Sequence, residues 1–443
     1  MRALSYILGA LVLAILAYSP ATSLAQEELV TADRIGRTDA PIVLTWQIIA
    51  PHSHLATIQQ RADGFRALYE EWARAHPDVR IDVEVIPGER INETQTRLLE
   101  QARVGQAPDF SAVDSFFLPL FKLAGVLAPL NEFFDEAYLN DLFPFVRQGV
   151  TDSAGNVVAV WWSTDLRVLH YRTDLVPVPP RTEAELIETA ARVAGENPGI
   201  DGYLYNGGRW EGTFFDNVAH FWAQGGQLVD DTGRPIFNES SNREAMLNML
   251  RFLQQTVQAG ASPARVASIA TYGDFEAAAQ AGTVAMFQGG HWQYFNLRNL
   301  LTPEEFAKWA VAPIPQLRED LASTGTGGWT QAVFTNDPQK KALAVDFIRS
   351  VYDGPGAVVI GNPPTRQSLF QSEPFYTEDP IWDTFRQFLV SGQARPGFPI
   401  YPTISTEMQV AIGEVLTGTK SPEQALDDAW ARVLEAYQSL QGT

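Results

Sequence analysis

Four tryptophan segments of this chain lie beside glycine or small polar residues. They are Trp161-Trp162-Ser163, Gly208-Arg209-Trp210, Gly290-His291-Trp292 and Gly327-Gly328-Trp329. We expect these segments in loops, because core tryptophans normally belong to periodic apolar runs. Indole rings stack on the C–H faces of sugar rings, while hydroxyls need fixed donors and acceptors. Packing explains any single tryptophan as well, but the four segments together favour a carbohydrate-sized binding site.

Motifs of the common enzyme classes are missing or incomplete. The chain has no Gly-x-Ser-x-Gly and no His-Glu-x-x-His. Gly325-Thr326-Gly327-Gly328 starts like a dinucleotide fingerprint, but Thr330 occupies the third glycine position. Residues 413–421 resemble a phosphate loop only with the lysine displaced by one. His52 and His54 are the only close histidine pair and do not favour a metal site. We expect no catalytic residue, no metal and no cofactor.

Composition narrows the class of protein further. The 443 residues carry 32 Lys and Arg against 52 Asp and Glu, a net charge of −20, which disfavours nucleic acid and anionic membranes as partners. The absence of cysteine excludes disulfides, Cys-ligated zinc, iron–sulfur clusters and a thiol nucleophile. A hydrophobic content of 45% indicates a folded protein, and the length predicts two lobes.

The first 25 residues predict a secretory signal peptide. Met1-Arg2 is positive, residues 3–17 are mostly apolar, Pro20 breaks a helix, and Ser23-Leu24-Ala25 is a cleavage pattern. A membrane anchor is the alternative, but the run is short and no basic cluster follows it. No cysteine stands near the cleavage point, so we expect no lipid anchor. An exported, soluble chain without disulfides is compatible with the bacterial periplasm.

The hydrophobic pattern predicts alternating strands and helices. Strands are expected at 42–46, 80–86, 110–113 and 167–171, and helices at 61–76, 91–104, 183–194, 214–224, 242–259 and 272–281. Strand, helix, strand, helix, strand is the order of an open parallel α/β sheet, in which ligands bind at the carboxyl ends of the strands. No internal repeat is visible.

The order of several short motifs resembles a known family, the bacterial extracellular solute-binding proteins of ABC importers. The resemblance is to the maltose-binding type and its oligosaccharide-binding relatives, and it covers essentially the whole mature chain. It is carried by the motifs at 105–110 (GQAPDF), 125–130 (GVLAPL), 169–175 (LHYRTDL), 275–292, 313–315 with 327–329, 341–348, 361–366 and 421–426. His170 and Arg172 are mild departures from the family pattern, and Trp329 fits the oligosaccharide-binding relatives better than the maltose protein.

This resemblance implies an α/β fold with two discontinuous lobes that close on ligand about a hinge, the periplasmic binding protein fold. We expect the first lobe at 41–155 and 325–360, and the second at 156–324 and 361–443.

The resemblance also implies a set of ligand-binding residues. Trp292 and Trp329 would form stacking and hinge-side walls, and Gly327 and Gly328 would offer backbone groups to hydroxyls. Asp114 and Asp165 would accept hydrogen bonds from hydroxyls. The other expected ligand-binding residues are Trp162, Trp210, Phe215 and Arg395, whereas Arg366 is expected to brace the lobes.

The predicted function is a periplasmic, monomeric binding protein that delivers a sugar or oligosaccharide to the permease subunits of an ABC importer. A first alternative is an anionic solute such as glycerol phosphate, held by Arg395, Arg366 and Arg209. A second is a glycan-cleaving enzyme using Asp114 and Asp165 as facing carboxylates.

Overall fold

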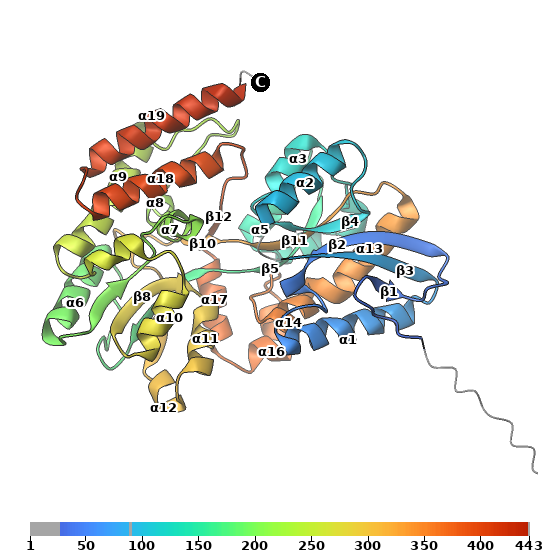
Figure 1. Ribbon diagram of the computed structural model, residues 1–443, viewed down its shortest axis with the longest axis horizontal. Helices are drawn as coiled ribbons and strands as arrows, with labels where there is room; N and C mark the ends of the chain where they lie inside the picture. The colour runs from blue at the N-terminus through green and yellow to red at the C-terminus, as the bar shows by residue number, and fades with distance from the viewer. Residues whose placement is uncertain (1–26, 88–90, 442–443) are drawn as a thin grey trace, which may run out of the picture.

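Two α/β lobes lie side by side in the computed structural model, which describes residues 27–87 and 91–441 (Figure 1). The expected signal peptide, residues 1–25, lies outside the described residues. Each lobe has its own sheet and its own hydrophobic core. Among the described residues, no helix combines the length and apolar character needed to cross a bilayer.

The first lobe is built on a six-stranded sheet of order β1-β3-β2-β4-β11-β5. Its strands are β1 (Arg34–Gly36), β2 (Ile42–Ile49), β3 (Val79–Ile86), β4 (Phe110–Asp114), β5 (Ala159–Thr164) and β11 (Gly328–Val333). Strands β3, β2 and β4 are parallel, while β11 runs antiparallel to both β4 and β5. The predicted strands at 42–46, 80–86 and 110–113 are therefore confirmed, and β2 continues to Ile49.

Helices cover both faces of this sheet. On one face, α1 (Gln59–Ala75) and α13 (Pro338–Val351) pack an aromatic core around Trp46, whose ring is 5.5 Å from Phe110 and 5.2 Å from Phe347. On the other face, α2 (Ile91–Arg103) and α3 (Leu118–Ala124) form a smaller cluster. The remaining helices are α4 (Glu136–Asp141), α5 (Pro144–Val150), α14 (Ala357–Ile360), α15 (Leu369–Ser372), α16 (Pro374–Thr377) and α17 (Ile381–Leu389).

The second lobe has a four-stranded sheet of order β7-β8-β6-β9. Its strands are β6 (Arg167–Arg172), β7 (Asp201–Leu204), β8 (Val284–Gly290) and β9 (Trp309–Ala312). Its helices are α6 (Glu183–Glu196), α7 (Glu211–Asn217), α8 (Ala219–Trp222), α9 (Ser240–Gln258), α10 (Gly273–Gln280), α11 (Trp292–Leu300), α12 (Pro303–Phe306), α18 (Tyr401–Leu416) and α19 (Pro422–Gln441). Thr182 caps α6 in a reciprocal capping box with Glu185, an arrangement that contributes about 1 kcal/mol.

Three segments join the lobes. The first lies between β5 and β6, the second leads from β9 to β11 through β10 (Thr324–Thr326), and the third leads from α17 to α18 through β12 (Gly392–Ala394). Strands β10 and β12 pair in parallel, so the second and third segments run side by side between the lobes (Figure 1). The fold is thus two-lobed and α/β, with both lobes discontinuous in sequence.

Strand β5 and helix α17 belong to a different lobe from the one that the sequence analysis expected. Strand β5 belongs to the first sheet, so this sheet includes residues up to Thr164 rather than ending before 156. Trp382, Phe385 and Leu389 of α17 lie in the core of the first lobe rather than the second. These elements favour crossings near 165, 313–327 and 390–400, while the full lobe ranges stay a prediction.

Candidate functional site

The carboxyl edge of the first sheet carries several of the predicted site residues. Asp114 is the last residue of β4, and Trp329, near the start of antiparallel β11, is its cross-strand partner. His52 follows β2 at the same edge, and its ring lies 5.1 Å from the Trp329 ring, edge to face. Trp329 is half-buried rather than enclosed in the core. This edge therefore offers an indole and a carboxylate next to each other.

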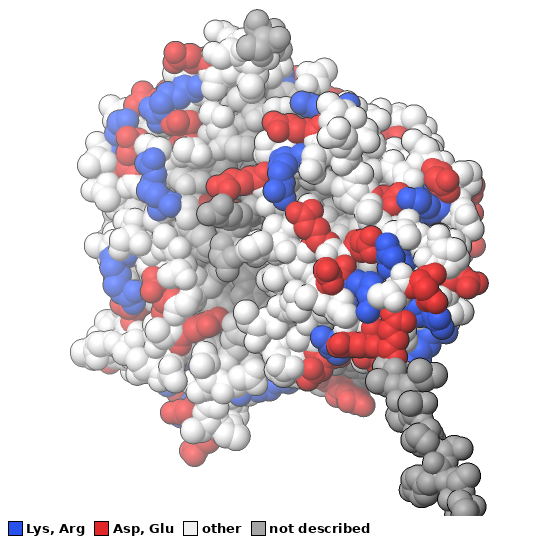
Figure 2. Space-filling model, turned by 45° about the vertical axis from the view of Figure 1, so that its right-hand side comes forward, with Lys and Arg blue, Asp and Glu red and all other residues white. Residues whose placement is uncertain are grey.

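The matching edge of the second sheet carries the other tryptophans. Trp210 follows β7, and Trp292 follows β8. Both are half-buried, and their rings lie 5.1 and 5.0 Å from Tyr272, each edge to face. Arg167 begins β6 opposite Gly290, the last residue of β8. Figure 2 shows the surface hollowed between the two halves of the molecule, which makes this interlobe cleft the candidate site.

Three predicted residues come from the three joining segments and meet there. Asp165 lies between β5 and β6, Gly327 between β10 and β11, and Arg395 directly after β12. The backbone N–H of Gly327 donates to Asp165 Oδ1 at 3.0 Å. A Cβ atom at Gly327 would lie 3.4 Å from Asp165 Oδ2 and 3.5 Å from the Arg395 guanidinium. Both side chains therefore lie close to this glycine.

Arg395 bridges the two lobes. Its guanidinium lies 4.7 Å from the ring of Phe116 in the first lobe and 4.3 Å from the ring of Phe215 in the second. It also pairs with Asp114 at 3.7 Å and with Glu211 at 3.4 Å. Burial raises the pKa of the Asp114 carboxyl, although Arg395 opposes this shift. The guanidinium of Arg395 therefore connects the two walls of the cleft.

Arg167 forms the second charged centre, deeper in the cleft. It pairs with Asp165 and, at 2.9 Å, with Asp216, and its guanidinium lies 4.1 Å from the Phe215 ring. Asp216 also accepts from Tyr272 at 2.8 Å, and its side chain is fully buried. Burial raises the pKa of Asp216, while Arg167 is the main opposing influence.

The balance of charge in this cluster limits the ligand chemistry. Four carboxylates, from Asp114, Asp165, Glu211 and Asp216, surround two guanidiniums. Both cations are thus already neutralised by the protein. What remains available at the partly exposed Asp114 and Asp165 is acceptor capacity for hydroxyl donors.

In the described part of the chain, several buried polar atoms without a partner lie at the same two edges, while others, such as Ser262 Oγ and His220 Nε2, lie elsewhere in the molecule. Among the described residues, His52 Nδ1, Trp162 Nε1 and Ser163 Oγ at the first edge have no hydrogen bond, and neither do Asn206 Oδ1 and Trp210 Nε1 at the second. Buried polar atoms usually have a partner in the protein or in bound molecules. Their position at facing sheet edges supports a polar ligand between the lobes.

The structure brings most of the predicted residues together and corrects several details. Asp114, Asp165, Phe215, Gly327 and Arg395 form one contact network, and Trp292 joins it because Arg167 lies 5.4 Å from its ring. Trp329 and Gly328 lie at the first edge, and Trp210 is connected through Tyr272.

The loops expected at three of the tryptophan segments are wrong. Trp161, Trp162 and Ser163 lie in strand β5, Trp292 begins helix α11, and Gly328 and Trp329 begin strand β11. Trp162 is 1% exposed and has no free ring face for a ligand. The expectation of free backbone groups at Gly327 is also wrong. Its N–H is bound by Asp165, and its carbonyl accepts from Thr164 Oγ1 at 2.8 Å.

Sequence reasoning missed Arg167, Glu211, Tyr272 and His52. Arg167 could have been found from the sequence. A charged residue at the start of a buried strand, two positions after Asp165, suggests an ion pair between the two. Glu211 meets Arg395 from a helix 184 residues away in sequence, and nothing local to either residue indicates that contact.

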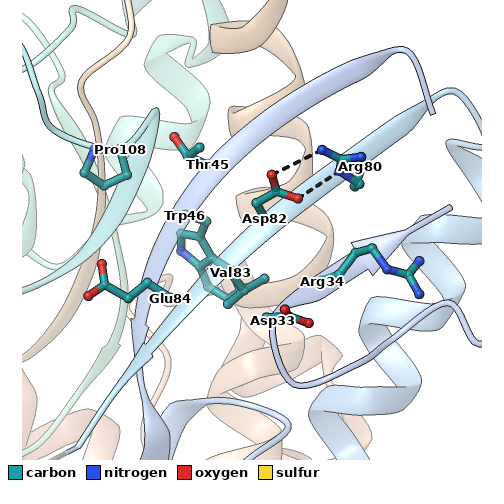
Figure 3. A pocket seen from close by; sticks show the side chains of 9 residues that line it. All are labelled: Asp33, Arg34, Thr45, Trp46, Arg80, Asp82, Val83, Glu84 and Pro108. Carbon is teal, nitrogen blue, oxygen red and sulfur yellow. Dashed lines mark hydrogen bonds and ion pairs between the residues drawn. The ribbon is translucent and has the colours of Figure 1, made fainter. Parts of the chain in front are cut away.

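A separate pocket on the first lobe does not share these features. It lies over the middle of β2 and the first half of β3, on the face of the sheet rather than its carboxyl edge (Figure 3). Arg80 lies there bound to Asp82 at 2.8 Å, and Glu84 is bound by Arg97 at 3.2 Å. Arg34 is paired with Glu27 at 3.2 Å, so charged residues of this pocket are already paired, some of them with residues outside it. The interlobe cleft remains the candidate site.

A two-lobed α/β fold with a polar, aromatic cleft defines a solute-binding protein. Residues 56–353 match the family described as bacterial extracellular solute-binding protein, and the chain belongs to this family. It is 28% identical over 321 residues to a probable ABC transporter-binding protein of Deinococcus radiodurans, covering 68% of this chain and 73% of that protein. It is 23% identical over 383 residues to a maltotriose-binding protein of Pyrococcus abyssi, covering 84% and 78%.

Solved structures support the fold. The sugar-binding protein MalE of Xanthomonas citri superposes with a TM-score of 0.75 at 20% identity, covering 90% of this chain and 99% of that one. The cyclic α-maltosyl-1,6-maltose binding protein of Arthrobacter globiformis gives a TM-score of 0.71 at 23% identity, covering 89% and 98%. The family and these neighbours are binding proteins, not enzymes.

Proposed function

We propose that this protein captures a neutral sugar or oligosaccharide between its lobes and delivers it to the permease subunits of an ABC importer. The observation that carries this proposal is the pairing of two half-buried indoles, Trp292 and Trp329, on facing sheet edges with the partly exposed carboxylates Asp114 and Asp165. Stacking faces and hydroxyl acceptors together are what a sugar ring requires. Relatives named for maltotriose and maltosyl-maltose binding support this ligand class.

Binding would act on the relative position of the lobes. Arg395 touches both lobes and the joining segments meet at Asp165 and Gly327, so a ligand bound between the edges also contacts the closing region. A ligand with higher affinity for the closed form shifts the population toward it, and the importer would recognise that form.

An anionic ligand fits the site less well. Arg395 and Arg167 are neutralised by carboxylates, and Arg366 is paired with Asp353 at 3.2 Å. This pair lies within the first lobe and not between the lobes, where Arg366 was expected to act. Arg209 is exposed. A phosphate or carboxylate ligand would have to compete with these carboxylates and would face their repulsion.

A glycan-cleaving function has even less support. Asp114 and Asp165 are each bonded to an arginine, so neither is placed as a free acid beside a water molecule. We further propose export through the signal peptide of residues 1–25, a periplasmic location, and action as a monomer without nucleic acid.

The test is a titration of the purified protein with neutral sugars, including maltose and maltotriose, followed by tryptophan emission. A saturable change is expected, because Trp292 and Trp329 would contact the ligand. Mass spectrometry of small molecules that co-purify would identify the natural sugar. No response to any sugar, together with binding of glycerol phosphate, would overturn the proposal.

A further inference from the structure

His52 stands between two indole rings at the edge of the proposed sugar site. Its ring centroid lies 5.3 Å from that of Trp162 and 5.1 Å from that of Trp329, and both contacts are edge to face. Trp162 is fully buried, whereas Trp329 is half-buried, so the imidazole lies between the core and the cleft wall. His52 itself is 9% exposed.

The backbone of His52 is held in place by a hydrogen bond from the core and by a neighbouring proline. Tyr352 donates its hydroxyl to the His52 carbonyl at 3.0 Å, and the Tyr69 hydroxyl lies 2.7 Å from that of Tyr352. Pro51, in the same short helical turn, restricts the backbone further. The ring therefore occupies one position without any ligand, which lowers the entropy cost of using it for recognition.

The imidazole is neutral and has capacity for a hydrogen bond. Burial lowers the pKa of His52 to about 3, with a smaller contribution from Arg61. A neutral imidazole has one N–H donor and one acceptor nitrogen. Among the described residues, His52 Nδ1 is buried and has no hydrogen-bonding partner. An unpaired buried polar atom of this kind is destabilising unless a bound molecule satisfies it.

His54 provides a comparison. It is also buried, at 3% exposed, and its Nδ1 likewise has no partner among the described residues, but its Nε2 lies 2.7 Å from the carbonyl oxygen of Thr31. Its ring lies 5.5 Å from the core residue Tyr69 rather than beside the cleft tryptophans. In the part of the chain that the structure describes, no group of three or more potential metal ligands occurs.

We infer that His52 determines specificity in the first lobe: its imidazole bonds to a hydroxyl of the sugar ring that stacks on Trp329. This inference rests on the proposed function and adds a residue that the sequence analysis did not assign to the ligand. It defines a subsite made of His52 and Trp329 for one pyranose ring, in which stacking provides affinity and the imidazole selects a hydroxyl position.

The experiment compares His52→Phe and His52→Gln with the wild type by calorimetric titration of maltotriose and its monodeoxy derivatives. His54→Gln is the matched control, a second buried histidine two residues away. We expect His52→Phe to bind maltotriose about 10- to 100-fold more weakly. It should bind one monodeoxy derivative as well as the wild type does, because that derivative lacks the hydroxyl in question. His52→Gln should recover part of the loss, and His54→Gln should bind like the wild type.

Two outcomes would overturn the inference while leaving the proposed function intact. One is a His52→Phe variant that binds maltotriose within twofold of the wild type. The other is a loss of equal size for every derivative, which would mean that His52 only supports the shape of the wall.

If His52→Phe does not fold, ¹⁵N resonances of the wild-type imidazole provide the test, and they should shift on adding maltotriose. Unchanged resonances under saturation would also contradict it. A wild type that binds no sugar would instead be a failure of the proposed function itself.

Discussion

Gly327 donates its backbone N–H to the carboxylate of Asp165 across two of the three segments that join the lobes. Arg395, from the third segment, also lies close to this glycine, since a Cβ atom there would be 3.5 Å from its guanidinium. The residues that would contact the ligand are therefore also the residues that connect the lobes. Under the proposed function, a ligand that engages Asp165 would act directly on the segments that join the lobes.

Removing the bridge between the lobes should destabilise the protein. The Arg395→Gln substitution leaves Asp114 and Glu211 without their shared cation, and the side chain of Arg395 is only 14% exposed. We expect a loss of about 3 kcal/mol in the free energy of unfolding, measured by urea denaturation. Arg37→Gln, which removes an exposed pair with Asp39, is the control and should cost less than about 1 kcal/mol. Equal losses for both variants would contradict the bridge.

Two adjacent glycines should respond differently to alanine. Gly328 has a φ of +133°, and a Cβ atom there would lie 2.0 Å from the carbonyl oxygen of Ser163. Gly327 has no such constraint, and its nearest neighbour would be Asp165 Oδ2 at 3.4 Å. Backbone strain alone should lower the stability of Gly328→Ala by about 1–3 kcal/mol, and the clash with Ser163 should lower it further. The stability of Gly327→Ala should stay close to that of the wild type. Thermal unfolding of both variants checks this. A Gly328→Ala protein as stable as Gly327→Ala would refute it.

Much of the architecture follows from the sequence because it is encoded locally. The alternation of β3 and the apolar run of β2 reflect burial on one or both faces, and Thr182 with Glu185 begins α6 through a local cap. Strands β2, β3 and β4 and helices α1 and α2 were predictable within a few positions for this reason, whereas the three-residue strand β1 was not predicted.

The contacts between residues inside the cleft could be predicted less well from the sequence. Trp162 carries the same local signal as Trp329, a tryptophan beside small polar residues, yet it lies in the edge strand β5 and its ring is buried in the core. Which face a strand residue presents depends on register, and the register of β5 is set by β11, more than 160 residues away in sequence. The contact of Glu211 with Arg395 likewise depends on tertiary structure alone.

Acid should destabilise the folded state through buried histidines. Burial lowers the pKa of His52 and His291 to about 3 and that of His170 to about 4. In the unfolded chain these groups have a pKa near 6.5, so between pH 6.5 and 4 the unfolded state binds more protons. Their contribution is fully present above pH 6.5 and is lost as the pH falls, by up to about 1.4 kcal/mol per pH unit for each group. Urea denaturation at pH 7, 6 and 5 measures this slope.

A single substitution separates this effect from that of the buried carboxyls. Burial raises the pKa of Asp114 and Asp216, so these groups oppose the histidine effect. In His291→Phe the titrating ring is replaced by an apolar ring among neighbours such as Phe385, at 5.6 Å. The variant should show a shallower loss of stability between pH 7 and 5 than the wild type. An unchanged slope would show that His291 is not buried in its neutral form.

The most direct test of the account is calorimetric titration of maltotriose into the wild type, Trp292→Ala and Trp329→Ala. Trp430→Ala, which changes a tryptophan of α19 that packs on Phe237 in the second lobe, is the control. The account predicts one sugar per chain, a loss of affinity of about 10- to 100-fold for each of the two cleft variants, and wild-type affinity for Trp430→Ala. Sugar binding that is unaffected by removal of both cleft indoles would contradict it.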